Sequence, residues 1–163
     1  MSDLQRLAAH HAAALLRFER ENREWFARSV PDRGDAYFAD FAARHAGLLA
    51  EQKTSACHFH VLVEADGTVL GRFNLVDVAD GEAELGYRVA ERAAGRGVAT
   101  DGVRRVAALA RRAYGLCRLT AGTTLDNAGS LAVLRRTGFT PVGEVSLDGR
   151  PGLRFARELT ADD

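Results

Sequence analysis

The segment from Glu82 to Thr100, EAELGYRVAERAAGRGVAT, constrains the fold of this chain more than any other part of the sequence. In its first half polar and apolar residues alternate, with Glu84 on one side and Leu85 and Tyr87 on the other. Such a period of two is typical of a half-buried strand. Its second half is rich in glycine and leads into a helical pattern. The segment therefore predicts a strand, a glycine turn and a helix in direct succession.

The glycine turn predicts a binding site for an anion. The first N–H groups of a helix have no partner within it, and the positive end of the helix dipole attracts negative charge. Gly95 and Gly97 have no Cβ atom, so a ligand can approach the backbone closely. We therefore expect a phosphate group at the start of this helix.

Two common phosphate-binding motifs do not fit this turn. A P-loop requires a lysine after its last glycine, but Gly95 is followed by Arg-Gly-Val-Ala-Thr. A dinucleotide fingerprint requires a third glycine where Thr100 stands, and an acidic residue about twenty positions further on, where none is present. The sequence therefore excludes a P-loop and a dinucleotide-binding fingerprint at this turn.

Size and charge limit the class of protein. A chain of 163 residues has the size of a single domain, residues 1–163. Its 22 basic and 22 acidic side chains give a formal net charge of zero, which removes the electrostatic case for nucleic acid or an anionic membrane as partner. Cys57 and Cys117 form no CxxC pair and fit reduced thiols. We expect a cytoplasmic protein without a membrane span.

Helical and strand patterns alternate along the chain. Their order predicts an α+β (mixed α/β) fold, in which a mostly antiparallel twisted sheet contains one parallel βαβ pair and is flanked by helices. The predicted helices are residues 2–28, 36–50, 98–114 and 127–137, and the predicted strands are residues 58–63, 69–78, 82–89, 117–123, 139–145 and 153–159.

Two further groups of side chains each allow two interpretations. His58 and His60 share one face of a strand at a spacing that suits a metal, but no further ligand lies nearby in the sequence, so we expect no metal. Aromatic residues around Pro31, including Trp25 and Tyr37, would either line a pocket or pack in the core between helices and sheet.

Three parts of the sequence together resemble the GCN5-related N-acetyltransferases (GNAT). Arg92, Gly95 and Gly97 match the acyl-CoA-binding pattern Arg/Gln-x-x-Gly-x-Gly/Ala of that family. The segment NAGSLAVLRRTGF, residues 127–139, is similar to its Asn-x-x-Ser/Ala…Gly-Phe segment. Leu85-Gly86-Tyr87 is most similar to the branch that acetylates ribosomal-protein N-termini, the RimJ/RimL-like branch. The predicted order of elements also agrees with the family over nearly the whole chain.

The resemblance implies acetyl-CoA as cosubstrate and no metal. In the family, the glycine loop wraps the pyrophosphate of coenzyme A, and the end of the preceding strand pairs with the pantetheine arm. Carried over to this chain, the cofactor-binding residues are Val89, Arg92, Ala94, Gly95, Arg96, Gly97, Val98, Ala99 and Asn127. Asn127 could also serve only as a helix cap.

The resemblance further implies a direct attack of an amine on the thioester. We expect Glu84 to act as general base through water, with Glu82 as the alternative; either could instead pair with an arginine across the sheet. The N–H of Val89 would polarise the thioester carbonyl. Many relatives carry a tyrosine acid where this chain has Leu134, which leaves Ser130 as the candidate acid.

The acceptor is the least constrained part of the prediction. We expect it to contact Trp25, Tyr37, Phe73 and Asn74. A peptide N-terminal α-amine is the first choice, and a small amine such as an antibiotic or polyamine is the second. A third interpretation is a CoA-binding regulatory module without turnover. Because members of the branch are often dimers, a homodimer is also expected.

Overall fold

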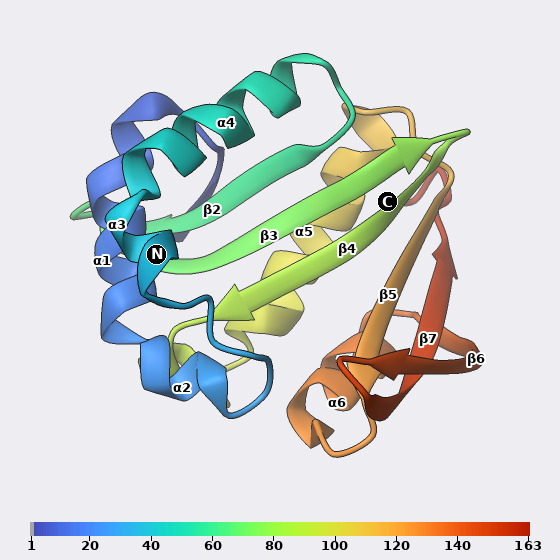
Figure 1. The fold of residues 1–163 in the computed structure, drawn as a ribbon. Coiled ribbons are helices and arrows are strands. Elements are labelled where there is room, and N and C mark those ends of the chain that lie inside the picture. Colours follow the sequence, from blue (N-terminus) through green and yellow to red (C-terminus); the bar gives the residue numbers. More distant parts are fainter. Residues whose placement is uncertain (1) are drawn as a thin grey trace.

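The computed structural model describes residues 2–163, which form one seven-stranded sheet with helices on both faces (Figure 1). The strand order is β1-β2-β3-β4-β5-β7-β6, and only β4 and β5 are parallel neighbours. This confirms the predicted mixed α/β fold. The strands are β1 (Ser2–Arg6), β2 (His58–Glu64), β3 (Val69–Ala79), β4 (Glu82–Val89), β5 (Arg118–Thr124), β6 (Thr140–Leu147) and β7 (Arg150–Glu158).

The helices form two layers. Within the described part of the chain, none of them is long and apolar enough to cross a lipid bilayer. They are α1 (Ala12–Glu21), α2 (Arg23–Ala27), α3 (Asp35–Ala39), α4 (Phe41–Lys53), α5 (Val98–Arg112) and α6 (Ala128–Arg136), with short 3-10 turns η1 (Ala9–His11) and η2 (Glu91–Ala93).

Each face of the sheet carries its own apolar core. Phe18 and Phe41 of α1 and α4 pack on one face, and Val103 and Val106 of α5 pack on the other. The helix α5 approaches the sheet unusually closely at Gly102, where a Cβ atom would come within 2.1 Å of the Phe73 ring. This close approach fixes α5, and with it the glycine turn, against the sheet.

The prediction of a continuous helix over residues 2–28 is wrong. Ser2–Arg6 forms the edge strand β1, which pairs antiparallel with β2. Leu4 and Leu7 are spaced as on a helix, and five residues are too few to reveal the period of a strand. The helix also breaks at Asn22, whose side chain bonds to the carbonyl of Phe18 and to the N–H of Glu91.

Two other boundaries differ from the prediction. The expected helix over residues 36–50 is interrupted at Asp40, which separates α3 from α4. The closing hairpin turns through Asp148 and Gly149 alone, both with positive φ, so that Pro151 belongs to β7. Positive φ at both central residues is the pattern of a two-residue hairpin turn.

The sheet opens between its two parallel strands. β4 and β5 pair only from Glu82 to Glu84 on β4. Beyond Glu84, β4 continues to Val89 beside β3, and β5 continues to Thr124 beside β7. The diverging halves lie between α2 on one side and α6 on the other (Figure 1). Strand edges that diverge in this way leave backbone groups without a neighbouring strand, which is the setting of the candidate site.

Candidate active site

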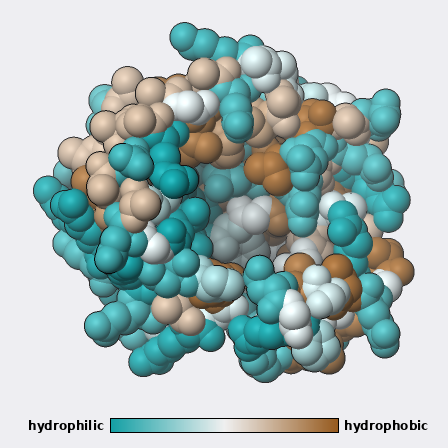
Figure 2. Space-filling view, viewed as in Figure 1, coloured by the Kyte–Doolittle hydropathy of each residue, from teal (hydrophilic) through white to brown (hydrophobic). Residues whose placement is uncertain are grey.

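Two cavities meet in the opening between β4 and β5. Their volumes are about 360 and 270 Å³, and they share five lining residues: Ser29, Val30, Tyr87, Asn127 and Ser130. The larger cavity extends to the glycine turn and α5, and we call it the loop arm. The smaller extends along β5 to the β6–β7 turn, and we call it the hairpin arm. The molecular surface is hollowed near the centre of this face (Figure 2).

The glycine turn of the loop arm has the geometry of an anion site. Gly95 and Gly97 have φ of +73° and +77°, and no atom lies within 4 Å of where a Cβ would stand. Gly97 is the N-cap of α5, and its carbonyl accepts the N–H of Asp101. The N–H groups between these two residues therefore have no partner within the helix. The turn fits a phosphate of a bound ligand.

The edge of β4 supplies a further backbone donor. The N–H of Ala90 donates to the carbonyl of Leu70, on the β3 side, at 2.8 Å. Because successive amides of a strand face opposite edges, the N–H of Val89 faces the opening. Val89 lines the loop arm, so its N–H is placed to donate to a ligand there.

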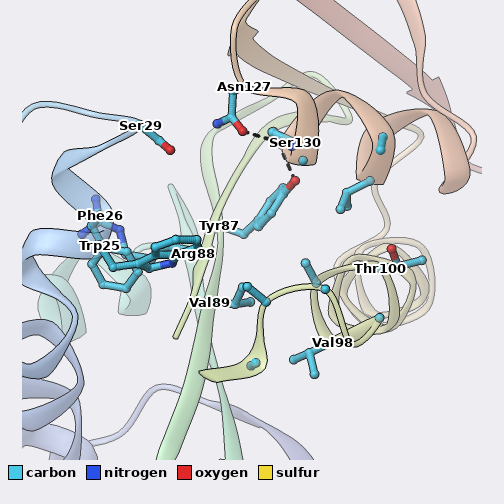
Figure 3. Close-up of a pocket in the computed structure, with 18 of the residues that line it drawn as sticks. Trp25, Phe26, Ser29, Tyr87, Arg88, Val89, Val98, Thr100, Asn127 and Ser130 are labelled. Atoms are coloured by element: carbon cyan, nitrogen blue, oxygen red, sulfur yellow. Dashed lines mark hydrogen bonds between the residues drawn. The ribbon is translucent and has the colours of Figure 1, made fainter. Parts of the chain in front are cut away.

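The two arms meet at three residues that are joined by hydrogen bonds (Figure 3). The Tyr87 hydroxyl lies 3.2 Å from Oγ of Ser130, and the Ser130 N–H donates to Oδ1 of Asn127 at 3.2 Å. Burial raises the pKa of Tyr87, and the bond to Ser130 partly opposes that shift. The phenol is therefore held protonated at neutral pH, beside the point where both arms open.

Behind one wall of the loop arm lies a buried carboxylate, that of Glu19. Glu19 of α1 has a side chain only 1% exposed, and it pairs with Arg88 at 2.9 Å, Arg33 at 3.3 Å and Arg72 at 3.7 Å. We call these four residues the Glu19 cluster. Of them only Arg88 lines the loop arm, where its guanidinium lies over the Phe26 ring, 4.4 Å from the centroid. The cluster holds three positive charges around one negative charge.

Most of the predicted site residues lie together in this opening. Trp25 lines the loop arm, and Ser130 and Asn127 line both arms. Asn127 also caps α6, so the two interpretations of this residue are compatible. The other predicted cofactor residues that line the loop arm are Val89, Ala94, Gly95, Gly97, Val98 and Ala99.

Two predicted cofactor residues and the two candidate bases, Glu82 and Glu84, do not line either cavity. Arg92 pairs with Glu64, and Arg96 is exposed beside the loop arm without lining it. Glu82 pairs with Arg118 of β5 at 3.3 Å, which is the cross-sheet pairing considered for it. Glu84 is half-buried, two residues before Gly86 of the hairpin arm, and its side chain has no hydrogen bond or ion pair within residues 2–163.

Three of the predicted acceptor residues also lie behind the lining. Phe73 is fully buried beneath α5. The Tyr37 hydroxyl accepts from Arg72 at 3.2 Å and so supports the Glu19 cluster from behind. Asn74 lies opposite Gly86 in the sheet, and its Oδ1 is buried without a hydrogen-bond partner in the described chain.

The sequence did not reveal several residues of the site. Tyr87 carries only a motif in the sequence, although its hydroxyl faces Ser130. Arg88, Ser29 and Val30 also line the loop arm. For Ser29 and Val30, the sequence signal is Pro31, which ends the helical pattern before it.

His58 and His60 both contact Tyr114. His60 lies 2.6 Å from the Tyr114 hydroxyl, and the His58 ring stacks on Tyr114 with 3.7 Å between centroids. Within residues 2–163, no group of three or more potential metal ligands gathers at one place.

A divided sheet with a glycine turn that fits a phosphate at one end of the opening agrees with the acyl-CoA-dependent acyltransferase class that the sequence resembles. Residues 3–140 match the family model of the acetyltransferase (GNAT) domain, and the chain therefore belongs to this family. As a member, it is an acetyl-CoA-dependent N-acetyltransferase, with acetyl-CoA as its cosubstrate.

Individual relatives agree with this assignment. The probable N-acetyltransferase YjcK of Bacillus subtilis (strain 168) is 28% identical over 134 residues, which are 78% of this chain and 74% of that protein. Mycobacterium smegmatis RimJ, solved with a CoA disulfide, is 25% identical with a TM-score of 0.86 over 96% of this chain and 81% of its own. The ribosomal-protein-S5-alanine acetyltransferase of Vibrio fischeri has the same fold, with 19% identity and a TM-score of 0.90 over 98% and 94% of the two chains.

Proposed function

We propose that this protein transfers the acetyl group of acetyl-CoA to the α-amine at the N-terminus of a peptide. The observation that carries the proposal is the meeting of two arms at Tyr87 and Ser130. One arm leads to the anion-binding turn, and the other opens toward the β6–β7 turn. This arrangement lets cosubstrate and acceptor enter from different directions and meet for direct attack.

The loop arm is the proposed site of acetyl-CoA. Gly95, Gly97 and the first N–H groups of α5 would hold its pyrophosphate. The free edge of β4 would pair with its pantetheine arm, and the N–H of Val89 would donate to the thioester carbonyl. Acetyl-CoA supplies an activated acetyl thioester, so the protein needs to position it and manage two protons.

Glu84 and Ser130 are the proposed proton carriers. Attack forms a carbon–nitrogen bond and breaks the carbon–sulfur bond; the amine loses a proton and the thiolate gains one. Gly86 lines the hairpin arm, and Glu84 lies about 7 Å from it along the strand. This separation from the cavity suits removal of the amine proton through a water molecule. Ser130 would give its proton to the thiolate and receive another from Tyr87, since a phenol is a much stronger acid than a serine hydroxyl.

The charge of the lining favours a peptide over a polyamine. Among the residues that line the two arms within the described chain, Asp148 is the only acidic one, and it lies at an exposed turn. A polyamine carries several ammonium groups, which a site with so little negative charge would bind poorly. Structural relatives named for acetylation of ribosomal proteins S5 and L7/L12 further support a protein N-terminus as acceptor.

An acceptor panel tests the proposal. Purified protein and acetyl-CoA are incubated with short peptides that have a free N-terminus, with the same peptides N-terminally blocked but carrying a lysine, and with spermidine. We expect CoA release only with the free N-termini, and fragmentation mass spectrometry to locate the acetyl group on the α-amine. Turnover of spermidine or of lysine side chains, with free N-termini left unmodified, would contradict the proposal.

A further inference from the structure

The Glu19 cluster contains more positive charge than its own residues neutralise. Three guanidinium groups surround one carboxylate, and Arg72 and Glu19 have side chains no more than 5% exposed. Neighbouring Arg23 pairs with Asp32 and Asp35, a group of net charge −1, which reduces the excess around the cluster from two positive charges to one. A net positive charge therefore remains beside the wall of the loop arm.

Arg88 is the member of the cluster that can share this charge with a ligand. Its Nη1 donates to Glu19, whereas its Nε and Nη2 make no hydrogen bond within residues 2–163. The ring of Phe26 holds the guanidinium plane from one side. Burial and the like charges of Arg33 and Arg72 lower the pKa of Arg88, while Glu19 opposes that shift. An anion in the cavity would relieve this repulsion and accept the free donors.

We infer that the acceptor carries a carboxylate close to its amine and that Arg88 binds this carboxylate. The inference rests on the proposed function only in that an amine is acetylated where the two arms meet, and it adds the charge that this acceptor carries. The carboxylate would come either from an acidic residue at the first or second position of a peptide or from the α-carboxylate of a free amino acid. A guanidinium with two adjacent free N–H groups suits bidentate recognition of a carboxylate.

The position of Arg88 points to the acceptor rather than to acetyl-CoA. Arg88 lies with Trp25 and Phe26 on the wall formed by α2, whereas the anion-binding turn and Val98 lie across the cavity (Figure 3). Its neighbour in sequence, Val89, directs its N–H toward the opening where the thioester is proposed to lie. Arg88 lines the loop arm and not the hairpin arm, so an acceptor that enters by the hairpin arm would place its amine at the junction of the two arms and its carboxylate beyond Ser29 and Val30, on Arg88.

The wild-type protein provides the first test. Initial rates are measured with pairs of acceptors that differ only in charge: peptides beginning Asp-Ala and Asn-Ala, peptides beginning Ala-Asp and Ala-Asn, and glycine with glycinamide. A charge-assisted hydrogen bond predicts a kcat/KM about 10- to 100-fold higher for the anionic member of at least one pair. Equal rates within every pair, or faster neutral members, would overturn the inference.

Variants assign the preference to Arg88. Arg88→Gln should reduce the anionic-to-neutral ratio of kcat/KM to near one, and Arg88→Lys should retain part of it. Arg20→Gln is the matched control, because it removes the same charge from the exposed side of α1. An unchanged ratio in Arg88→Gln, or a raised KM for acetyl-CoA alone, would overturn the inference.

The panel also separates the two proposals. If peptides react without regard to charge, the inference fails and the proposed function stands. If only small amines react, the proposed function fails, and the glycine pair still decides the inference. Circular dichroism of each variant checks that the fold is retained, and the wild-type panel tests the inference even if a variant does not fold.

Discussion

The Glu19 cluster and the group formed by Arg6, His58, His60 and Tyr114 are both polar clusters buried against the same sheet, yet their bonding differs. In the second group, which we call the Tyr114 cluster, Tyr114 lies 2.6 Å from Nε2 of His60 and accepts from Arg6 at 2.8 Å. Nδ1 of His60 lies 3.2 Å from the carbonyl of Phe73, and Arg6 also contacts Nδ1 of His58 at 3.2 Å. Both ring nitrogens of His60 thus have hydrogen-bond partners.

The difference lies in charge and in what each cluster faces. The Tyr114 cluster ties β1 and β2 to the end of α5, and its only fixed charge, on Arg6, lies at the exposed side. The Glu19 cluster has an excess of positive charge on partly exposed guanidinium groups, and one of these, Arg88, lines a cavity. A buried polar cluster with matched partners has a structural role, whereas one with unmatched charge beside a cavity indicates ligand binding.

The largest expected effect is on the carboxylate of the Glu19 cluster. Glu19→Gln leaves three guanidinium groups without a counter-charge, and we expect it to lower the free energy of unfolding by about 3–5 kcal/mol. Chemical denaturation measures the change. Glu21→Gln, at an exposed position of the same helix, should change stability by less than about 0.5 kcal/mol. Equal effects of the two changes would show that the charge of Glu19 does not stabilise the fold.

The Tyr114 cluster should make stability depend on pH. Burial is the largest cause that lowers the pKa of His60, from 6.5 to about 4, so the unfolded chain binds more protons than the folded chain between these values. The stabilising contribution is therefore complete above pH 6.5 and declines as pH falls toward 4, by up to about 3 kcal/mol. His60→Gln should flatten this part of the stability profile measured by denaturation. A variant profile parallel to that of wild type would refute the assignment to His60.

Two tyrosine substitutions separate catalysis from structure. Tyr87→Phe keeps the ring stacked near Phe73 but removes the hydroxyl beside Ser130, so kcat should fall about tenfold or more while stability changes little. Tyr114→Phe removes the partner of His60 and Arg6, so it should cost about 1 kcal/mol of stability and leave kcat unchanged. Steady-state kinetics and denaturation on both variants measure the contrast. The reverse pattern would exchange the roles of the two clusters.

The smallest effect is expected at the exposed ion pair of the sheet. Glu82→Gln breaks its pair with Arg118, and such surface pairs contribute about 0–1 kcal/mol. Acetyl transfer should continue at the wild-type rate, whereas Glu84→Gln should lower it. If Glu82→Gln is the slower of the two, the base is Glu82.

Local patterns predicted the part of the fold that local interactions determine. The alternation before Val89 and the glycine turn predicted β4, the turn after it and the start of α5, because strand, turn and helix are adjacent in sequence. β1 was missed because a five-residue edge strand is specified by its partner, β2, far along the chain. Its leucines carry no period that distinguishes strand from helix.

The same distinction holds for the site. The positions of Gly95, Gly97 and Asn127 at the starts of α5 and α6 were predictable, because glycine turns and helix caps are local features. The pairing of Glu19 with Arg88 joins residues 69 positions apart and depends on how α1 lies over β4. No motif or periodicity carries that information, so the charge beside the loop arm became visible only in the structure.

Calorimetric titration of acetyl-CoA tests most directly whether the loop arm is the cosubstrate site. The variants are Gly97→Trp, which fills the anion-binding turn, and Gly115→Trp at the opposite end of α5. Both glycines have positive φ, +77° and +66°, and open space at the Cβ position, so backbone strain is matched. We expect micromolar binding by wild type and Gly115→Trp and none by folded Gly97→Trp. Unchanged binding by Gly97→Trp would show that acetyl-CoA lies elsewhere.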